Sequence, residues 1–129
     1  MLRHIDAQNG IPIYEQIIRQ VTIAVADGSI TPGEHVPSVR ELANRLAVNP
    51  NTVVRAYRDL QAQGVLVPVR GTGLAIAADS VSKCLEQRLS LIRQSLRSVL
   101  EEAWRNRISK AELRTLCDSE LNRLTEEAL

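Results

Sequence analysis

Apolar residues recur at helical spacing in several separate stretches of the sequence. The first stretch spans residues 12–27, and Gly28 after it is a typical helix stop. Its apolar face is formed by Ile13, Ile17, Val21, Ala24 and Val25. Because these positions fall three or four residues apart, residues 12–27 are predicted to form an amphipathic helix.

Residues 37–60 carry the most informative pattern, which predicts two short helices with a tight turn between them. Ser38 and Glu41 have the spacing of a capping box, while Asn49 and Pro50 suit the N-cap and first position of a second helix. The inner faces are Val39, Leu42, Ala43 and Leu46, then Val53, Ala56, Tyr57 and Leu60. Two short helices joined by about three residues match a helix-turn-helix, whose second helix lies in the DNA major groove. A helical hairpin with solvated polar faces is the alternative.

A β-hairpin is predicted directly after these helices. Residues 65–69 form an apolar run with an internal proline, and residues 74–77 form a second short run. The turn between them is Arg70-Gly71-Thr72-Gly73, whose glycines allow the backbone to approach a ligand closely. An ordinary hairpin turn without a ligand is the alternative.

From Asp79 onward glycine and proline disappear, and the pattern becomes that of long helices. One helix is predicted from about Ser80 to Arg107, and its apolar residues follow alternating spacings of four and three, as in a heptad seam: Leu85, Leu89, Ile92, Leu96, Val99 and Ala103. A capping box at Ser109 and Glu112 predicts a last helix to about Thr125, with an inner face of Leu113, Leu116, Cys117, Leu121 and Leu124. Two helices make a poor core alone, so these faces either fold back on their own chain or pair with a second copy.

The wording of residues 36–73, VPSVRELANRLAVNPNTVVRAYRDLQAQGVLVPVRGTG, resembles the winged-helix DNA-binding domain of the GntR family of bacterial transcription regulators. The phrases PSVRELA and NPNTVVRAY resemble its YtrA subfamily, and the resemblance runs from about Ile11 to Ala78. It implies a mainly α fold, with an α+β winged helix-turn-helix in residues 1–78 and a C-terminal two-helix dimerisation tail in residues 79–129.

The same resemblance implies a sequence-specific transcription regulator, expected to be a repressor that binds a two-fold symmetric operator in double-stranded DNA as a homodimer. The expected DNA-binding residues are Ser38, Arg40, Asn49, Asn51, Thr52, Arg55, Arg58, Arg70, Gly71 and Thr72. The expected dimerisation residues are Leu85, Leu89, Ile92, Leu96, Val99 and Ala103. Many family members have arginine where this chain has Pro50 and Val54, so Arg55 is left between two roles, reading bases or contacting only the backbone.

Charge and composition narrow the kinds of binding that we expect. The net charge is +1, and residues 1–78 carry seven arginines against six acidic residues, so a DNA footprint must come from local clustering. With two tyrosines and one tryptophan, the chain lacks the aromatic platform on which single-stranded RNA is usually stacked. A non-catalytic protein-interaction module built on a winged helix is the alternative function.

Catalysis, cofactors and membrane insertion are not expected. The sequence has no nucleophile motif and no metal-ligand spacing, and its two cysteines, Cys84 and Cys117, are isolated. No apolar run approaches the ~20 residues of a membrane span, and the N-terminus lacks a signal-peptide core. These features favour a cytoplasmic protein that is not an enzyme. About 50 residues after the hairpin leave no room for a large ligand-binding domain, whereas a small-molecule effector held between helices of two chains stays an alternative.

Overall fold

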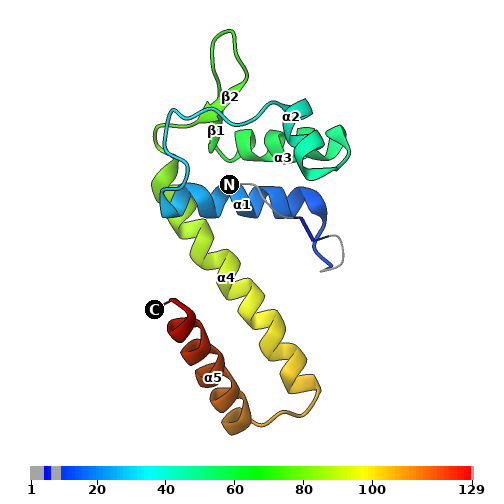
Figure 1. Cartoon of the computed structure of the whole chain (residues 1–129), viewed down its shortest axis with the longest axis vertical. Helices are drawn as coiled ribbons and strands as arrows, with labels where there is room; N and C mark the ends of the chain where they lie inside the picture. Colours follow the sequence, from blue (N-terminus) through cyan, green and yellow to red (C-terminus); the bar gives the residue numbers. More distant parts are fainter. Residues whose placement is uncertain (1–4, 7–9, 129) are drawn as a thin grey trace. The chain divides into compact units, whose positions relative to one another are not determined.

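A computed structural model describes residues 5–6 and 10–128 of the chain (Figure 1). The chain divides into two compact units, residues 1–91 and residues 92–129. Helix α4 runs through the division between them.

The first unit holds three helices and a two-stranded hairpin in the predicted order. Its elements are α1 (Ile13–Asp27), α2 (Val39–Leu46), α3 (Pro50–Ala62), β1 (Leu66–Pro68), β2 (Leu74–Ile76) and the first turns of α4 (Ser80–Arg105). Both α1 and α2 pack against α3. The predicted helix-turn-helix and hairpin are therefore confirmed, and the strands are one or two residues shorter than expected.

The predicted caps fix where α2 and α3 begin. The Ser38 hydroxyl accepts a hydrogen bond from the Glu41 backbone N–H at 3.1 Å and donates to the Glu41 carboxylate at 3.3 Å. The Asn49 side-chain oxygen accepts from the Asn51 N–H at 2.8 Å. Between the helices Ala47 adopts a left-handed conformation, with φ of 56°, which ends α2 and redirects the chain into α3.

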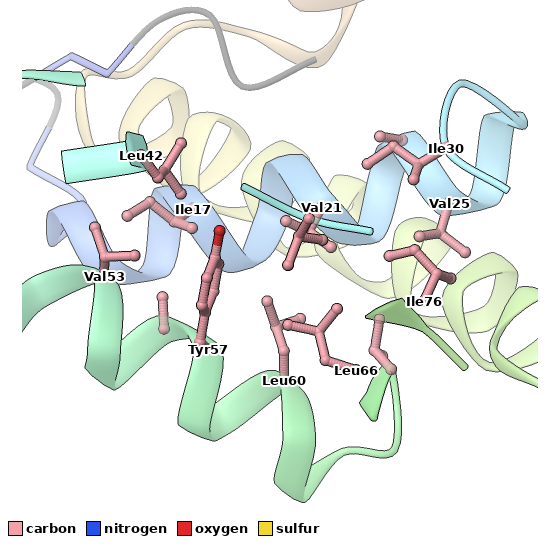
Figure 2. Packing of buried hydrophobic residues seen from close by; sticks show 14 of the residues in the cluster. Ile17, Val21, Val25, Ile30, Leu42, Val53, Tyr57, Leu60, Leu66 and Ile76 are labelled. Atoms are coloured by element: carbon pink, nitrogen blue, oxygen red, sulfur yellow. The ribbon is translucent and has the colours of Figure 1, made fainter. Parts of the chain in front are cut away.

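The core of the first unit lies between α1 and α3, and the hairpin and α2 close it. Figure 2 shows the α1 side chains Ile17 and Val21 facing the α3 side chains Val53 and Leu60, while Val25 lies further along α1, toward the hairpin. All five are buried, as the periodicity predicts. Burying one such side chain contributes roughly 1.5–3 kcal/mol, so these contacts hold α3 in place.

Among the described residues, Tyr57 is the one aromatic side chain that is buried in this core cluster. Its hydroxyl donates a 2.7 Å hydrogen bond to the carbonyl oxygen of Pro37, directly before the cap of α2. Burial raises the pKa of Tyr57 above that of an ordinary tyrosine; the Arg45 guanidinium opposes this shift, and the Glu41 carboxylate adds to it. The neutral phenol therefore ties α3 to the start of α2.

A further segment of the chain pairs with the edge of the hairpin, and the sequence did not predict this pairing. Strands β1 and β2 are antiparallel, with Leu66 opposite Ile76 and Pro68 opposite Leu74. Residues 33–36 run along the other edge of β2, where the Gly33 N–H donates to Ile76 O at 2.8 Å and the Val36 N–H to Leu74 O at 3.0 Å. The base of the hairpin is thereby joined to the segment that leads into α2.

The first turns of α4 belong to the same unit. Ser80 is buried and donates from its hydroxyl to Ala77 O at 2.8 Å, while Val81 and Cys84 pack against the core. Burial raises the pKa of the Cys84 thiol. The sequence placed a boundary after residue 78, whereas the first compact unit includes the first turns of α4 and extends to Leu91.

The second unit consists of the later part of α4 and of α5 (Lys110–Ala128). The predicted cap is confirmed, since the Ser109 hydroxyl accepts from the Glu112 N–H at 3.1 Å. Helix α4 ends two residues before the expected Arg107, which itself has a positive φ, and α5 runs three residues beyond the expected Thr125. Leu100 and Leu113 are half-buried and line a common hollow, so the two helices approach each other there.

The predicted inner face of α5 is not covered in the single chain. Leu116, Leu121 and Leu124 each expose more than half of their surface, and Cys117 is exposed as well. None of the described residues of α5 is buried. These side chains would therefore be buried only if another protein surface packed against them.

Candidate nucleic-acid interface

The outer face of α3 presents polar side chains in a row. Asn51, Arg55 and Arg58 are exposed, and Thr52 is half-buried. The inner positions of the same helix are occupied by the core, which leaves these side chains pointing away from it. Their amide, hydroxyl and guanidinium groups are those that bind base edges and phosphates.

Arg55 is held by a contact that sequence reasoning missed. Its guanidinium carbon lies 3.7 Å from the centroid of the Tyr14 ring, which comes from the start of α1. Residues 41 positions apart are thus in contact, and no local spacing rule links them. The ring places the guanidinium on the side of α3 that faces α1.

The start of α2 supplies two further candidate residues with different surroundings. Arg40 is exposed in the first turn of α2, off its buried face. Ser38 is exposed too, but its hydroxyl is engaged with Glu41. Asn49 is likewise engaged as the cap of α3. Ser38 and Asn49 therefore shape the helix starts, whichever further contacts they make.

The hairpin tip carries the remaining candidates, Arg70, Gly71 and Thr72, all of them exposed. The turn is closed by hydrogen bonds from the Val69 N–H to Gly73 O at 2.9 Å and from the Thr72 N–H to Val69 O at 3.1 Å. Gly71 has a φ of 86°, a conformation that favours glycine. The tip thus offers backbone and side-chain donors on a narrow turn.

One hollow brings the hairpin tip and the start of α2 together. Its volume is about 420 Å³, and it is lined by Val36, Pro37, Ser38, Val39, Glu41, Tyr57, Thr72, Gly73 and Leu74. Of the expected DNA-binding residues, it joins Ser38 and Thr72. Tyr57 and Glu41 were not foreseen at this place, since the sequence assigned them to the core and to a cap.

Comparison with known proteins decides the class of this winged helix. The family model for bacterial regulatory proteins of the gntR family matches residues 13–76, from the start of α1 to the end of β2. The chain is also 37% identical over 99 residues to the HTH-type transcriptional repressor YtrA of Bacillus subtilis, covering 77% of this chain and 76% of that protein.

The chain belongs to the GntR family.

Two solved structures extend this likeness to three dimensions. A GntR family transcriptional regulator from Listeria monocytogenes is 31% identical, with a TM-score of 0.67 over 87% of this chain and 97% of that one. The DNA-binding domain of AraR in complex with operator ORE1 is 29% identical, with a TM-score of 0.50 over 57% of this chain and 89% of that one. The predicted winged helix with C-terminal helices is therefore confirmed.

Family membership also settles the broad function. The GntR-family chain is a DNA-binding transcription regulator and not an enzyme. This sets aside the alternative of a winged helix that serves only as a protein-interaction module. In the part of the chain that the structure describes, no group of three His, Cys, Asp or Glu side chains could hold a metal ion. Among those same residues, no helix has the length and apolarity needed to span a bilayer.

The expected dimerisation residues of this GntR-family chain lie along α4. Leu85, Leu89, Ile92, Leu96 and Val99 are 41%, 61%, 55%, 50% and 57% exposed. Ala103 differs from them, because it is 7% exposed and thus already buried within its own unit. The heptad positions up to Val99 are therefore exposed apolar side chains in the single chain, two of them in the first unit and three in the second, and we call them the apolar row of α4.

Proposed function

We propose that this GntR-family regulator acts as a homodimeric repressor on a two-fold symmetric operator. The observation that carries the proposal is the exposed apolar row on α4. In each unit, the part of α4 that it contains leaves large apolar side chains at least 41% exposed at heptad positions, and exposed apolar side chains of this kind are typical of an interaction site. A row with heptad spacing fits the same row of a second copy across a two-fold axis.

The second unit adds apolar surface of the same kind. Trp104 is 75% exposed, and Leu116, Leu121 and Leu124 of α5 are each more than half exposed. Two helices from each chain would form a four-helix core, which one chain cannot build from its own pair. A second copy is thus the occupant that we assign to these faces.

Dimer formation makes physical sense for a domain with so little charge. One winged helix with seven arginines against six acidic residues binds weakly on electrostatic grounds alone. Joining two copies makes the second DNA contact intramolecular and raises overall affinity by roughly 10²–10⁴. Two recognition helices related by a two-fold axis then read half-sites separated by about one helical turn or a multiple of it.

On each half-site, the outer face of α3 together with Arg40 would enter the major groove. Asn51, Thr52, Arg55 and Arg58 would contact base edges or phosphates, with the caps Ser38 and Asn49 at the helix starts beside them. The hairpin tip with Arg70, Gly71 and Thr72 would lie along the adjacent minor groove or backbone. The DNA-binding domain of AraR, which has a similar fold and was solved in complex with an operator, supports operator binding by this fold. The name of the Bacillus subtilis relative, a repressor, supports the sign of regulation.

The test combines a measurement of the protein's molar mass with the selection of bound DNA duplexes from a random pool. Light scattering of the full chain at micromolar concentration should give the mass of a dimer. Duplexes selected from a random pool should contain an inverted repeat with half-sites about 10–10.5 base pairs apart or a multiple of that distance. Transcription from a promoter that carries the selected site should fall when the protein is added.

Other results would point elsewhere. A monomeric mass together with a single asymmetric site would contradict both the dimer and the symmetric operator. Higher transcription on addition of the protein would contradict repression and leave DNA binding intact.

A further inference from the structure

Tyr14 of α1 and Arg55 of α3 are in direct contact. The Arg55 guanidinium carbon lies over the Tyr14 ring, 3.7 Å from its centroid. This distance is well inside the ~6 Å within which a cation is attracted to an aromatic face. One face of the planar guanidinium is therefore covered by the ring.

The ring is the fixed partner of the pair. Tyr14 is half-buried and packs against the core, and its hydroxyl donates to the Glu15 carboxylate at 3.3 Å. Arg55 is exposed, and its long side chain has many rotamers. It follows that Tyr14 restricts Arg55 rather than the reverse.

The edge of the guanidinium stays available for another ligand. Within the described part of the chain, Arg55 forms no ion pair or hydrogen bond. Its five N–H donors lie in the guanidinium plane and project from the edge, whereas stacking uses the face. The contact with Tyr14 and a bidentate contact with an anionic oxygen pair can therefore exist together.

We propose that Tyr14 is a positioning residue for DNA binding. Its ring holds the Arg55 guanidinium in one orientation, so that the N–H edge meets a phosphate of the duplex on the α1 side of the recognition helix. This inference rests on the proposed function, because it takes the outer face of α3 to lie on DNA. A side chain ordered in advance loses less freedom on binding, which is how a residue without DNA contact strengthens the complex.

The experiment is a double-mutant cycle in the full chain. The probe is a fluorescent duplex carrying the site that the wild-type protein selects from a random pool, titrated over a series of salt concentrations. The variants are Tyr14→Leu, Tyr14→Phe, Arg55→Ala and the double variant Tyr14→Leu/Arg55→Ala. Leucine keeps the apolar bulk against the core and removes the ring, whereas phenylalanine keeps the ring and removes the hydroxyl.

We expect Arg55→Ala to weaken binding to selected and random duplexes alike and to lower the salt slope by about 1. Tyr14→Leu should weaken binding about two- to fivefold, the value of an exposed cation–π contact, and Tyr14→Phe should stay close to wild type. The double variant should bind as weakly as Arg55→Ala alone, because the ring has no guanidinium left to hold.

Three outcomes would overturn the proposal. Equal losses from Tyr14→Leu with and without Arg55 would mean that the ring acts only through folding. An Arg55→Ala variant that binds like wild type, while Arg40→Ala is impaired, would remove Arg55 from the interface and leave the proposed function standing. If the wild type bound no duplex even at low salt, both the role of Tyr14 and the proposed function would be contradicted.

Discussion

Ser38 and Arg40 lie two positions apart, yet their side chains have different roles. The Ser38 hydroxyl caps α2 through its bond to the Glu41 N–H, so it contributes to folding. Arg40 is exposed and off the buried face, so the fold does not need its guanidinium. Residues of the fold and candidate residues of the interface are thus interleaved, and substitutions can separate them.

We expect Arg40→Ala to lower the affinity for the selected operator by about 1–3 kcal/mol, as for a lost bidentate contact to a base. The thermal unfolding midpoint should stay unchanged, because an exposed side chain is removed. Operator titration at fixed salt measures the loss, and Arg114→Ala in α5 is the charge-matched control. Equal affinity of Arg40→Ala and wild type would take Arg40 out of the interface.

Tyr57 gives a prediction on stability and its pH dependence. Tyr57→Phe removes the hydrogen bond to Pro37 O and should lower the free energy of unfolding by roughly 0.5–1.5 kcal/mol near neutral pH. Because burial raises the pKa of Tyr57 in the folded state, the wild type retains this contribution below about pH 10 and loses it as the pH rises from there toward the folded pKa.

Urea unfolding of both proteins at pH 8 and at pH 10.5 checks this behaviour. The difference in unfolding free energy between wild type and Tyr57→Phe should shrink at the higher pH, since every other group titrates in both. A difference that grows with pH would show that the phenolate, rather than the phenol, is the form that the core accepts.

Among the elements, those with local signals were predictable from sequence. The starts of α2, α3 and α5 follow from Ser38, Asn49 and Ser109, whose caps use residues within three positions of one another. The buried faces of α1, α2 and α3 follow from their apolar spacing. Local chemistry thus decided both where these helices begin and which side they bury.

Elements and contacts that depend on distant residues were not predictable. The pairing of residues 33–36 with β2 joins segments about 40 positions apart, and one short extended stretch without alternation gives no signal for it. The Tyr14–Arg55 contact joins two helices in the same way. The end of α5 was placed too early because its last residues contain neither glycine nor proline to mark a stop.

The hairpin as an element leads to a prediction for Arg70. Because its guanidinium is exposed at a tip held by two backbone hydrogen bonds, we expect contact with the phosphate backbone rather than with bases. Arg70→Ala should weaken binding to all duplexes alike and reduce the salt slope by about 1, and Arg70→Lys should retain the slope. A changed sequence preference with an intact slope would instead place Arg70 in a groove.

For the whole molecule, the exposed row on α4 is the feature with the largest expected effect. Ile92→Asp with Leu96→Lys places charges at the positions that we expect to contact the second copy. Burying these charges costs free energy, and the two-fold axis makes this cost occur once in each copy. We expect a monomer, a first unit that stays folded, and operator binding reduced by a factor on the order of 10²–10⁴.

The matched control is Gln94→Asp with Ser98→Lys, which adds the same charges at the same spacing on exposed positions outside the row. Sedimentation and operator titration of both double variants test the idea. A dimer that persists in Ile92→Asp/Leu96→Lys with normal binding would move the interface to α5 or to the winged helix.

The β1–β2 hairpin is held by hydrogen bonds at its base and is exposed at its tip, and amide hydrogen exchange should show this difference. The N–H groups of Val36 and Ile76 donate to Leu74 O and Glu34 O at the base of the hairpin, where residues 33–36 run along β2, whereas the Thr72 N–H donates across the exposed turn. Deuterium should therefore replace the Thr72 proton quickly and the other two slowly. Bound DNA should slow exchange at the tip and leave exchange at the base unchanged. The hairpin would then contact DNA through a turn that adapts to the duplex while its base stays rigid.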